Sequence, residues 1–385
     1  MQLWERLLSE EEKMIRDSVR AVVKKQIAPL AQQLDEEESF PWEQLKALSD
    51  LGMLSILTPE EYGGAGGTQM SYVVAVEEIA KGCAATALVF FTQMHGALGL
   101  LLAGTEQQKK KYLPKLASGE MLGSIAITEP NAGSDAAGMS TAAVRDGNQY
   151  ILNGNKVFIT TGDKADIVTV FAKTDFGLRH KGISAFLVEK GTPGFKVGKV
   201  EKKMGVRGSS TAELIFDNCR VPDENLLGSE GEGFQICMEA CDYTRISTAA
   251  QALGISQGAF DIAFQYAQER SQFGKPIYDF QAIQFMLADM FTEIANARLL
   301  LYRTAKLIDE GVKDFTMEAS MAKAYCSEAA GRVTDAAVQI LGGYGYIRDY
   351  QVERMMRDAK ITQIYDGTNQ IQRMVIARNL QKRLK

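Results

Sequence analysis

Residue types that perform acid–base or nucleophilic chemistry are sparse in this sequence. It contains only two histidines, His95 and His180, and neither lies in a recognisable motif. A Ser-His-Asp relay, a Cys-His pair or a multi-histidine metal site needs a well-placed histidine, so none of these sites is indicated. We therefore expect a carboxylate, a lysine or a tyrosine to act as any acid or base, and we expect no metal site.

The glycines and cysteines exclude further kinds of site. Gly342-Gly343-Tyr344-Gly345 lacks the third glycine and the preceding strand of a Rossmann dinucleotide site, and no Walker A sequence occurs. The cysteines are odd in number and form no CxxC pair, which favours small, mostly buried residues in a reducing compartment over a zinc site or disulfides. They are Cys83, Cys219, Cys237, Cys241 and Cys326.

Composition limits the location and the partners of the protein. The 385 residues are 46% hydrophobic and 24% charged, as in a soluble globular protein of two or three domains. A formal net charge of −5 argues against nucleic acid as a partner. The acidic, amphipathic start is unlike a targeting segment, which predicts a cytoplasmic protein. The stretch between Lys81 and Glu106 is uncharged, but its polar centre, Thr92–Gly96, predicts two buried helices and no membrane span.

Hydrophobic periodicity predicts an α+β protein of three domains. Residues 1–120 have a helical pattern, whereas 121–230 contain short β-rich runs between turn signals, which predicts a β-barrel or sandwich. Residues 231–385 are helical again, and long segments joined by short loops predict a four-helix bundle. The predicted long helices cover about 234–269, 279–309, 315–340 and 350–382.

Four segments combine glycines, small polar side chains, aromatics and arginine in ways that suit a flat ring or a phosphate. Each also has an ordinary interpretation that the residues alone leave open: a turn, a buried strand, a solvated ion pair on a helix, or a helix C-cap. The segments are Ile127–Asp135, Phe158–Thr160, Asp242–Arg245, and Arg270–Gly274 with Gln281 and Gln339–Gly345. In this order, along almost the whole chain, they resemble the acyl-CoA dehydrogenase family of flavoproteins, above all its short-chain, butyryl-CoA dehydrogenase-like members.

The segment Tyr365-Asp366-Gly367 carries the candidate acid. Thr368 or Asn369 is a natural N-cap for the helix that follows, so Asp366 is expected in the loop ahead of that helix. An Asp-Gly pair by itself is most often a turn. The resemblance instead implies that Asp366 is the catalytic base, at a position where most short-chain and medium-chain relatives carry Glu, and that it removes the α-proton of an acyl-CoA thioester.

The resemblance also implies an FAD cofactor and an acyl-CoA site. Contacts with the flavin ring and ribityl chain are implied for Ile125, Ala126, Ile127, Thr128, Gly133, Ser134, Phe158, Ile159, Thr160, Thr368, Asn369 and Gln370. The ADP half is implied to contact Arg270, Phe273 and Gln281, with Gln339, Ile340, Leu341, Gly342 and Gly343 of a neighbouring subunit, so a homotetramer is expected. Acyl-CoA contacts are implied for Ser134, Phe234, Asp242, Tyr243, Thr244, Arg245, Tyr365 and Gly367. An electron-transferring flavoprotein is the implied electron acceptor.

Asp in place of Glu shortens the catalytic arm by one methylene. Because a misplacement on the order of 1 Å can cost ~10²-fold in rate, this exchange bears on the substrate. Three explanations stay open: an alicyclic substrate such as cyclohexanecarboxyl-CoA that lies closer to the loop, an engineered exchange in a butyryl-CoA-type enzyme, or an oxidase of the same fold such as a nitroalkane oxidase. A non-catalytic family member is the alternative that is not an enzyme. Phe90, Phe91, Gln93 and Met94 fit either an acyl-tail site or ordinary core packing.

Overall fold

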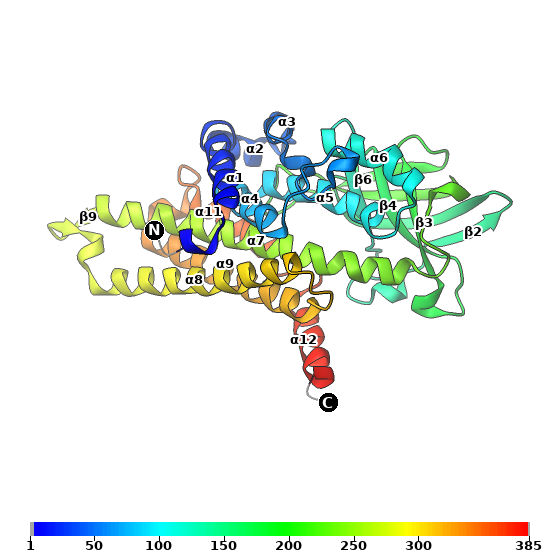
Figure 1. Cartoon of the computed structure of the whole chain (residues 1–385). Helices are drawn as coiled ribbons and strands as arrows, with labels where there is room; N and C mark the ends of the chain where they lie inside the picture. The colour runs from blue at the N-terminus through cyan, green and yellow to red at the C-terminus, as the bar shows by residue number, and fades with distance from the viewer. Residues whose placement is uncertain (1–3, 384–385) are drawn as a thin grey trace.

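The computed structural model describes residues 4–383, which form helices, then a β sheet, then helices again (Figure 1). The first helical part begins with a capping box at Ser9 and Glu12, which satisfies free backbone N–H groups at the start of α1. Its α-helices are α1 (Glu10–Val22), α2 (Ala31–Glu37), α3 (Trp42–Asp50), α4 (Gln69–Gly82), α5 (Ala84–Ala103) and α6 (Glu106–Ser118).

Helix α5 corrects one expectation, because it runs unbroken through Thr92–Gly96 where two helices were predicted. The Thr92 hydroxyl donates to the Leu88 carbonyl one turn earlier, so the polar centre is accommodated within the helix. A Cβ atom on Gly96 would lie 2.4 Å from the Gly123 backbone, so this glycine permits close packing on the sheet rather than ending a helix. Among the described residues, α5 alone is long and apolar enough to cross a bilayer, but 89% of its apolar window is buried in the protein.

The middle part is one eight-stranded sheet whose path runs β6-β7-β3-β2-β4-β5-β8, with β1 paired in parallel to β4. Its apolar side chains form their own core, which includes Tyr150, Phe186 and Phe216. The long antiparallel pair β3–β7 is interrupted by two register shifts. The strands are β1 (Gly123–Ala126), β2 (Ala142–Asp146), β3 (Gln149–Thr160), β4 (Ile167–Lys173), β5 (Ile183–Glu189), β6 (Phe195–Val200), β7 (Thr211–Pro222) and β8 (Leu226–Leu227).

The last part is built on α7 (Gly233–Glu269), which runs from the sheet to the opposite end of the molecule (Figure 1). The predicted helix over 350–382 is wrong as a single element, because α11 ends at Ile361 and α12 starts only at Asn369. The loop between them carries Asp366. The other elements are the hairpin β9 (Ser271–Gln272) and β10 (Lys275–Pro276), then α8 (Gln281–Asp309), α9 (Thr316–Leu341), α10 (Gly343–Tyr346), α11 (Val352–Ile361) and α12 (Asn369–Arg383).

A buried polar network ties the two helical parts together. Arg298 of α8 donates from Nε to Glu77 of α4 at 3.1 Å, and the Tyr302 hydroxyl donates to the same carboxylate at 2.8 Å. Gly254 lets α7 cross α4, because a Cβ atom there would lie 2.3 Å from the Glu77 carbonyl oxygen. The helices that hold the site are therefore fixed to one another by close packing and by a buried charge pair.

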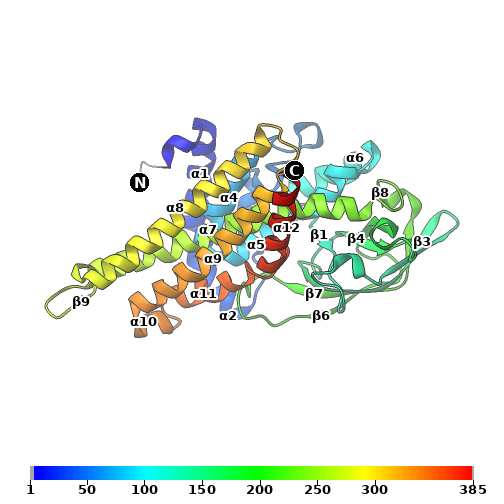
Figure 2. The same cartoon turned by 90° about the horizontal axis from the view of Figure 1, so that it is seen from below.

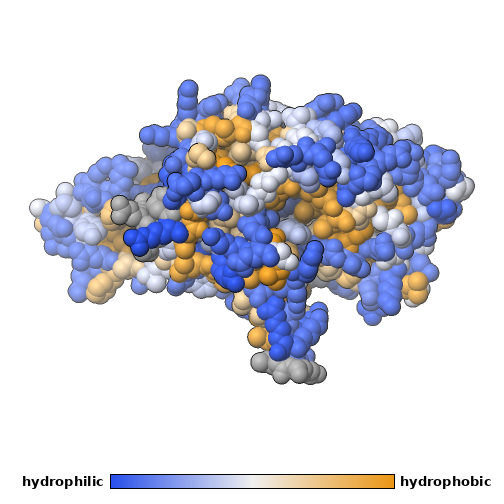
Figure 3. All heavy atoms as spheres, in the orientation of Figure 1, coloured by the Kyte–Doolittle hydropathy of each residue, from blue (hydrophilic) through white to orange (hydrophobic). Residues whose placement is uncertain are grey.

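Hydrophobic side chains also remain on the surface. Orange areas interrupt the hydrophilic surface along the middle of the face in Figure 3, and α12 projects from the body in Figure 1. Large exposed apolar side chains of the last helical part include Phe273, Phe285, Leu299, Met374 and Leu380. These side chains are spread over the β9–β10 hairpin, α8 and α12.

Candidate active site

The loop that carries Asp366 lies between α11 and α12 and has an unusual backbone. Asp366 and Gly367 both adopt positive φ angles, of 52° and 82°. The side-chain amide of Gln372 donates to the carbonyls of both residues, at 2.9 Å each. Thr368 accepts a hydrogen bond from the Ile371 N–H at 3.3 Å, which confirms the predicted N-cap. The first turn of α12 thus holds the loop in a conformation that a non-glycine residue seldom adopts.

The Asp366 carboxylate faces helices from both helical parts. Thr248 of α7 donates its hydroxyl to Asp366 Oδ2 at 2.6 Å. The preceding residue, Ser247, shares hydrogen bonds with the Tyr72 hydroxyl at 2.8 Å and with His95 Nε2 at 3.1 Å. Burial lowers the pKa of His95 to about 4, against the opposing charge of Asp366. His95 is therefore neutral at physiological pH and is a polar wall of the site rather than a charged one.

Lys323 of α9 holds the loop through hydrogen bonds to its backbone and to the first residue of α12. Its side chain has no exposed surface, and its ammonium donates to the Gly367 carbonyl at 2.8 Å and to Asn369 Oδ1 at 3.0 Å. Burial lowers the pKa of Lys323 to about 7, while the nearby Asp366 charge opposes that change. Asn369 also bonds to Ser327, so the start of α12 is anchored on α9.

A second surface is formed by β1 and the end of β3. Because side chains alternate along a strand, Ile125 and Thr160 are partly exposed, whereas Ala126 and Ile159 face the sheet core. Phe158 lies where the β3–β7 register shifts, with φ 60° and 65% of its surface exposed. A positive φ angle is unfavourable for phenylalanine, and such strained residues at bulges are common where a side chain is presented to a ligand.

The turn that contains Gly133 and Ser134 follows this surface, and both residues are exposed. Ile127 and Thr128, just before the turn, are partly exposed. The next residue, Glu129, is a buried anchor instead: its carboxylate accepts hydrogen bonds from the N–H groups of Ser140 and Thr141 at 2.5 and 3.0 Å. The turn is thus tied at both ends, and its small residues are left open to solvent.

Asp242 and Arg245 form an ion pair on α7 that is buried, not solvated. Thr316, at the start of α9, donates to the other Asp242 oxygen at 2.6 Å. The Arg245 Nε is buried and has no hydrogen-bond partner within residues 4–383. Tyr243 packs its ring against Phe315, and Thr244 bonds within its own helix at 3.2 Å.

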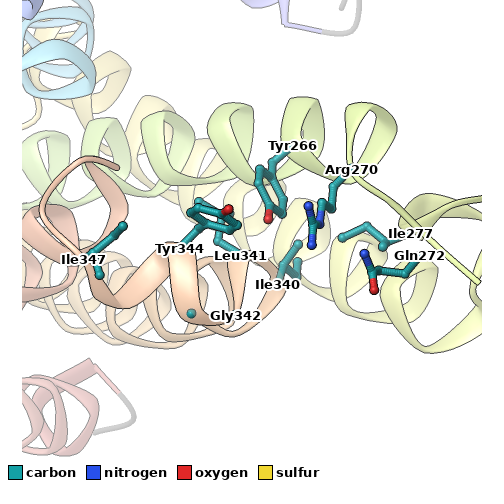
Figure 4. Close-up of a pocket in the computed structure, with 10 residues that line it drawn as sticks. Tyr266, Arg270, Gln272, Ile277, Ile340, Leu341, Gly342, Tyr344 and Ile347 are labelled. Atoms are coloured by element: carbon teal, nitrogen blue, oxygen red, sulfur yellow. The ribbon is translucent and has the colours of Figure 1, made fainter.

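An open pocket of about 470 Å³ lies at the far end of the bundle (Figure 4). The Arg270 guanidinium lies 5.7 Å from the centre of the Tyr344 ring, and Gly342 and Gly343 at the end of α9 line the same pocket. The pocket therefore offers one cation and a glycine pair beside aromatic walls, which suits a pyrophosphate and a base. Its lining residues are Tyr266, Arg270, Gln272, Ile277, Ile340, Leu341, Gly342, Gly343, Tyr344 and Ile347.

Three residues predicted for the ADP half are not brought into this pocket. Phe273 is 93% exposed at the tip of the β9–β10 hairpin, where Phe273 and Gly274 have positive φ angles. Gln281 and Gln339 are exposed and do not line the pocket. Arg270 and the residues from Ile340 to Gly343 meet within one chain.

Within one chain, the loop that carries Asp366 and the pocket that contains Arg270 lie far from each other. Lys323, which touches the loop, and Ile340, which lines the pocket, are 17 residues apart on the single helix α9, a rise of about 25 Å. Figures 1 and 2 show α10 and β9 at the end of the bundle away from the strands. The predicted cofactor residues therefore fall into two groups.

Sequence reasoning did not find Thr248, Lys323 or Gln372. Lys323 had a usable signal, because a lone lysine within the small, apolar run Ala319–Ala324 is expected to be buried and paired. Thr248 had none, since its contact with Asp366 joins residues 118 positions apart. Phe90 and Phe91 are fully buried, and Gln93 bonds to the Gly123 N–H at 2.8 Å, so Gln93 connects α5 to β1.

The open residues suit a flat, anionic cofactor better than a metal. An exposed phenylalanine on a bulge beside partly exposed aliphatic residues can pack against a planar ring, and the glycine turn leaves room for a phosphate or hydroxyl chain. Within residues 4–383, no group of three or more His, Cys, Asp or Glu side chains could hold a metal ion. All five cysteines are free, and four of them are buried.

Known proteins agree with this arrangement in order and extent. Models of the acyl-CoA dehydrogenase N-terminal, middle and C-terminal domains match residues 9–120, 124–219 and 231–381. The chain belongs to the acyl-CoA dehydrogenase family. It is therefore an oxidoreductase, its cofactor is FAD, and its three-part architecture is the acyl-CoA dehydrogenase fold, as the sequence predicted.

Three proteins illustrate which members this acyl-CoA dehydrogenase resembles. Acryloyl-CoA reductase (NADH) of Anaerotignum propionicum is 49% identical over 98% of this chain and 96% of its own length. Cyclohex-1-ene-1-carbonyl-CoA dehydrogenase of Syntrophus aciditrophicus is 48% identical over 97% of this chain and 90% of its own. The solved structure of butyryl-CoA dehydrogenase from Megasphaera elsdenii superposes with a TM-score of 0.95 at 45% identity, covering 97% of this chain and 99% of that one.

Proposed function

We propose that the protein oxidises an acyl-CoA thioester to the 2-enoyl-CoA, with Asp366 as the base that takes the α-proton. The observation that carries this proposal is the placement of Asp366: a partly exposed carboxylate on a loop whose backbone is fixed by Gln372, with one carboxylate oxygen bonded to Thr248 of α7 and the other without a hydrogen bond from the described residues. The Asp366 N–H has no partner within residues 4–383. That N–H is a donor for the thioester oxygen, on which charge develops as the α-proton leaves.

The cofactor residues take two roles in this proposal. Partly exposed side chains of β1 and the bulge, with the glycine turn and the start of α12, hold the flavin ring and ribityl chain. Arg270 and the Gly342–Gly343 pair hold the ADP half that extends from a neighbouring subunit, since one chain separates the two groups. FAD, when bound there, accepts the β-hydrogen as hydride. The substrate excludes water from Asp366 when it binds, which raises the basicity of the carboxylate.

The coenzyme A part of the substrate is assigned to the first half of α7. Arg245 has a buried Nε without a partner in the described residues 4–383, and Asp242, which itself accepts a hydrogen bond from Thr316, pairs with the Arg245 guanidinium. A buried cationic donor of this kind is available for a carbonyl or phosphate of the pantetheine arm. Phe234, which is partly exposed and lies 5.6 Å from the His180 ring, lines the same side.

We propose a short-chain or alicyclic acyl group, such as cyclohexanecarboxyl-CoA. Asp366 reaches one methylene less far than glutamate, so the α-carbon has to lie closer to the loop. The similarity to proteins named for a cyclohexene carboxyl thioester and for butyryl-CoA supports both choices. A cytoplasmic homotetramer that passes electrons to an electron-transferring flavoprotein completes the proposal. The exposed apolar side chains on α8 and α12 support the assembly.

The decisive experiment is an anaerobic titration of the FAD-loaded protein with linear, branched and alicyclic acyl-CoAs, followed by flavin absorbance. We expect rapid bleaching with one short or alicyclic thioester and its loss in Asp366→Asn. If Asp366→Asn bleaches at the full rate, Asp366 is not the base. If butyryl-CoA reduces the flavin fastest and Asp366→Glu reduces it faster still, the alicyclic assignment is wrong.

Two further measurements distinguish a dehydrogenase from an oxidase and from a reductase. Stoichiometric oxygen consumption with no need for a protein acceptor would identify an oxidase instead. Because one relative is named an acryloyl-CoA reductase, the chemically reduced protein is also mixed with acryloyl-CoA. A yellow protein that no acyl-CoA bleaches would indicate a non-catalytic member of the family.

A further inference from the structure

Thr248 differs from three other buried helical threonines, Thr92, Thr304 and Thr334, in where its hydroxyl donates. A helical threonine commonly donates its hydroxyl to the carbonyl four residues earlier. Thr92, Thr304 and Thr334 all do so, at 2.7 to 2.8 Å. Thr248 is fully buried and donates to Asp366 Oδ2 at 2.6 Å instead.

The contact leaves the two carboxylate oxygens unequal. Oδ2 accepts the Thr248 hydroxyl, whereas no hydrogen bond within residues 4–383 reaches Oδ1. A β-branched side chain on a helix has a stiff χ1 angle, so the hydroxyl is a fixed point rather than a mobile one. The fixed donor determines which oxygen is free to accept a proton.

The loop backbone is fixed independently of this contact. Gln372 of α12 holds the carbonyls of Asp366 and Gly367, and Lys323 of α9 holds the Gly367 carbonyl. Only the side-chain torsions of Asp366 remain free, and the Thr248 hydroxyl restricts them. Helices α7, α9 and α12 thus position a short acidic side chain.

From this geometry we infer that Thr248 is a positioning residue for the base: it holds Asp366 Oδ2 so that Oδ1 points to the substrate α-carbon, and it sets the reach of the shortened arm. The inference rests on the proposed role of Asp366. It predicts that Thr248 acts on the chemical step more than on substrate binding.

Other titratable groups around Asp366 also influence its carboxylate. They come from each packed element: Tyr72 of α4, His95 of α5, Cys241 of α7, Lys323 of α9 and the adjacent Tyr365. None of these groups is itself replaced in a Thr248 variant, but the contact between the Thr248 and Tyr365 hydroxyls is lost together with the contact to Asp366.

The test compares Thr248→Val, which removes the hydroxyl at nearly constant volume, with Thr248→Ser, which keeps it. Stopped-flow flavin reduction by the best acyl-CoA is measured from pH 5 to 9. We expect Thr248→Val to reduce flavin about 10- to 100-fold more slowly, since a misplaced base loses rate steeply. KM should change less than about threefold, and Thr248→Ser should recover most of the rate.

Thr334→Val is the matched control, because Thr334 is equally buried on a helix but bonds only to its own helix. FAD content and circular dichroism establish that each variant is folded, and Thr248→Ala replaces Thr248→Val if the latter is not. The inference is overturned if Val or Ala keeps the wild-type rate, or if Ser loses as much rate as Val. Asp366→Asn separates the two hypotheses, since full activity in that variant refutes the proposed function itself.

Discussion

Replacing Lys156 with methionine should destabilise the middle part of the protein and loosen the turn that we assign to the flavin. The Lys156 side chain is fully buried, and its ammonium donates to Glu129 at 2.8 Å and to the Ile127 carbonyl at 3.0 Å. Glu129 in turn accepts the Ser140 and Thr141 N–H groups. The ion pair therefore closes the loop that carries Gly133 and Ser134.

The magnitude follows from the buried charge that would be left behind. Removing one partner of a buried ion pair costs about 3–5 kcal/mol of unfolding free energy, because the other charge loses its compensation. Burial opposes ionisation of Glu129, yet the Lys156 ammonium and the donors from Thr141 and Ser140 lower its pKa to about 2. Since this pKa is depressed, the Glu129 contribution is complete above about pH 4.5 and is lost as pH falls through about 2. Adding Glu129→Gln to Lys156→Met removes the unpaired charge, so the double variant should regain much of the lost stability.

Hydrogen exchange measured by mass spectrometry gives a local readout. Peptides that cover residues 129–141 should exchange faster in Lys156→Met than in the wild type, and the protein should retain less FAD after gel filtration. Lys196→Met is the control, because its ion pair with Asp217 is exposed at 3.3 Å and should contribute about 0–1 kcal/mol. Unchanged exchange in this loop, or a double variant less stable than Lys156→Met, would refute the reasoning.

Three further substitutions test separate features. Burial lowers the pKa of His95 from 6.5 in the unfolded chain to about 4 in the folded protein, so the unfolded state binds the proton more tightly. The free energy of unfolding should therefore rise by about 3 kcal/mol as pH increases from 4 to 6.5. Urea titrations of His95→Gln should lack that rise. Phe158 has a positive φ angle and an exposed side chain, so Phe158→Gly removes backbone strain without removing core packing. The stability of the FAD-free protein should stay within about 1 kcal/mol of the wild type, whereas FAD affinity should fall. A large loss of stability would show that Phe158 is a core residue. Arg270→Met should weaken FAD retention without altering the pH profile of flavin reduction by the retained fraction, whereas unchanged retention would remove Arg270 from the cofactor site.

Local chemistry was predicted well because its causes lie within a few residues. The N-cap at Thr368 and the loop position of Asp366 follow from capping, which involves neighbours along the chain. Strand geometry separates two residues that were both expected to contact the flavin, since Ile125 is partly exposed whereas the Ala126 side chain is buried in the sheet core. The change from helical to β pattern near Met121 likewise agrees with β1, which starts at Gly123.

Predictions were wrong where a contact between distant segments decided the outcome. Gly96 was expected to end a helix, yet it lies inside α5 because β1 packs against it there. Helical periodicity over 350–382 did not reveal the break between α11 and α12, where Lys323 and Gln372 stabilise a loop with positive φ angles. Helix-forming residues on both sides gave no sign of these long-range hydrogen bonds.

The sequence by itself determined the family, the order of helical and β segments, and Asp366 as the candidate acid, because each is encoded in local patterns or in residue types at fixed spacing. Only the tertiary structure decided what surrounds that acid. Folding places Thr248 on Asp366, buries Lys323 beneath the loop, and separates the arginine pocket from both by the length of α9. These relations arise from how whole helices pack, and packing depends on surfaces that no single stretch of sequence contains.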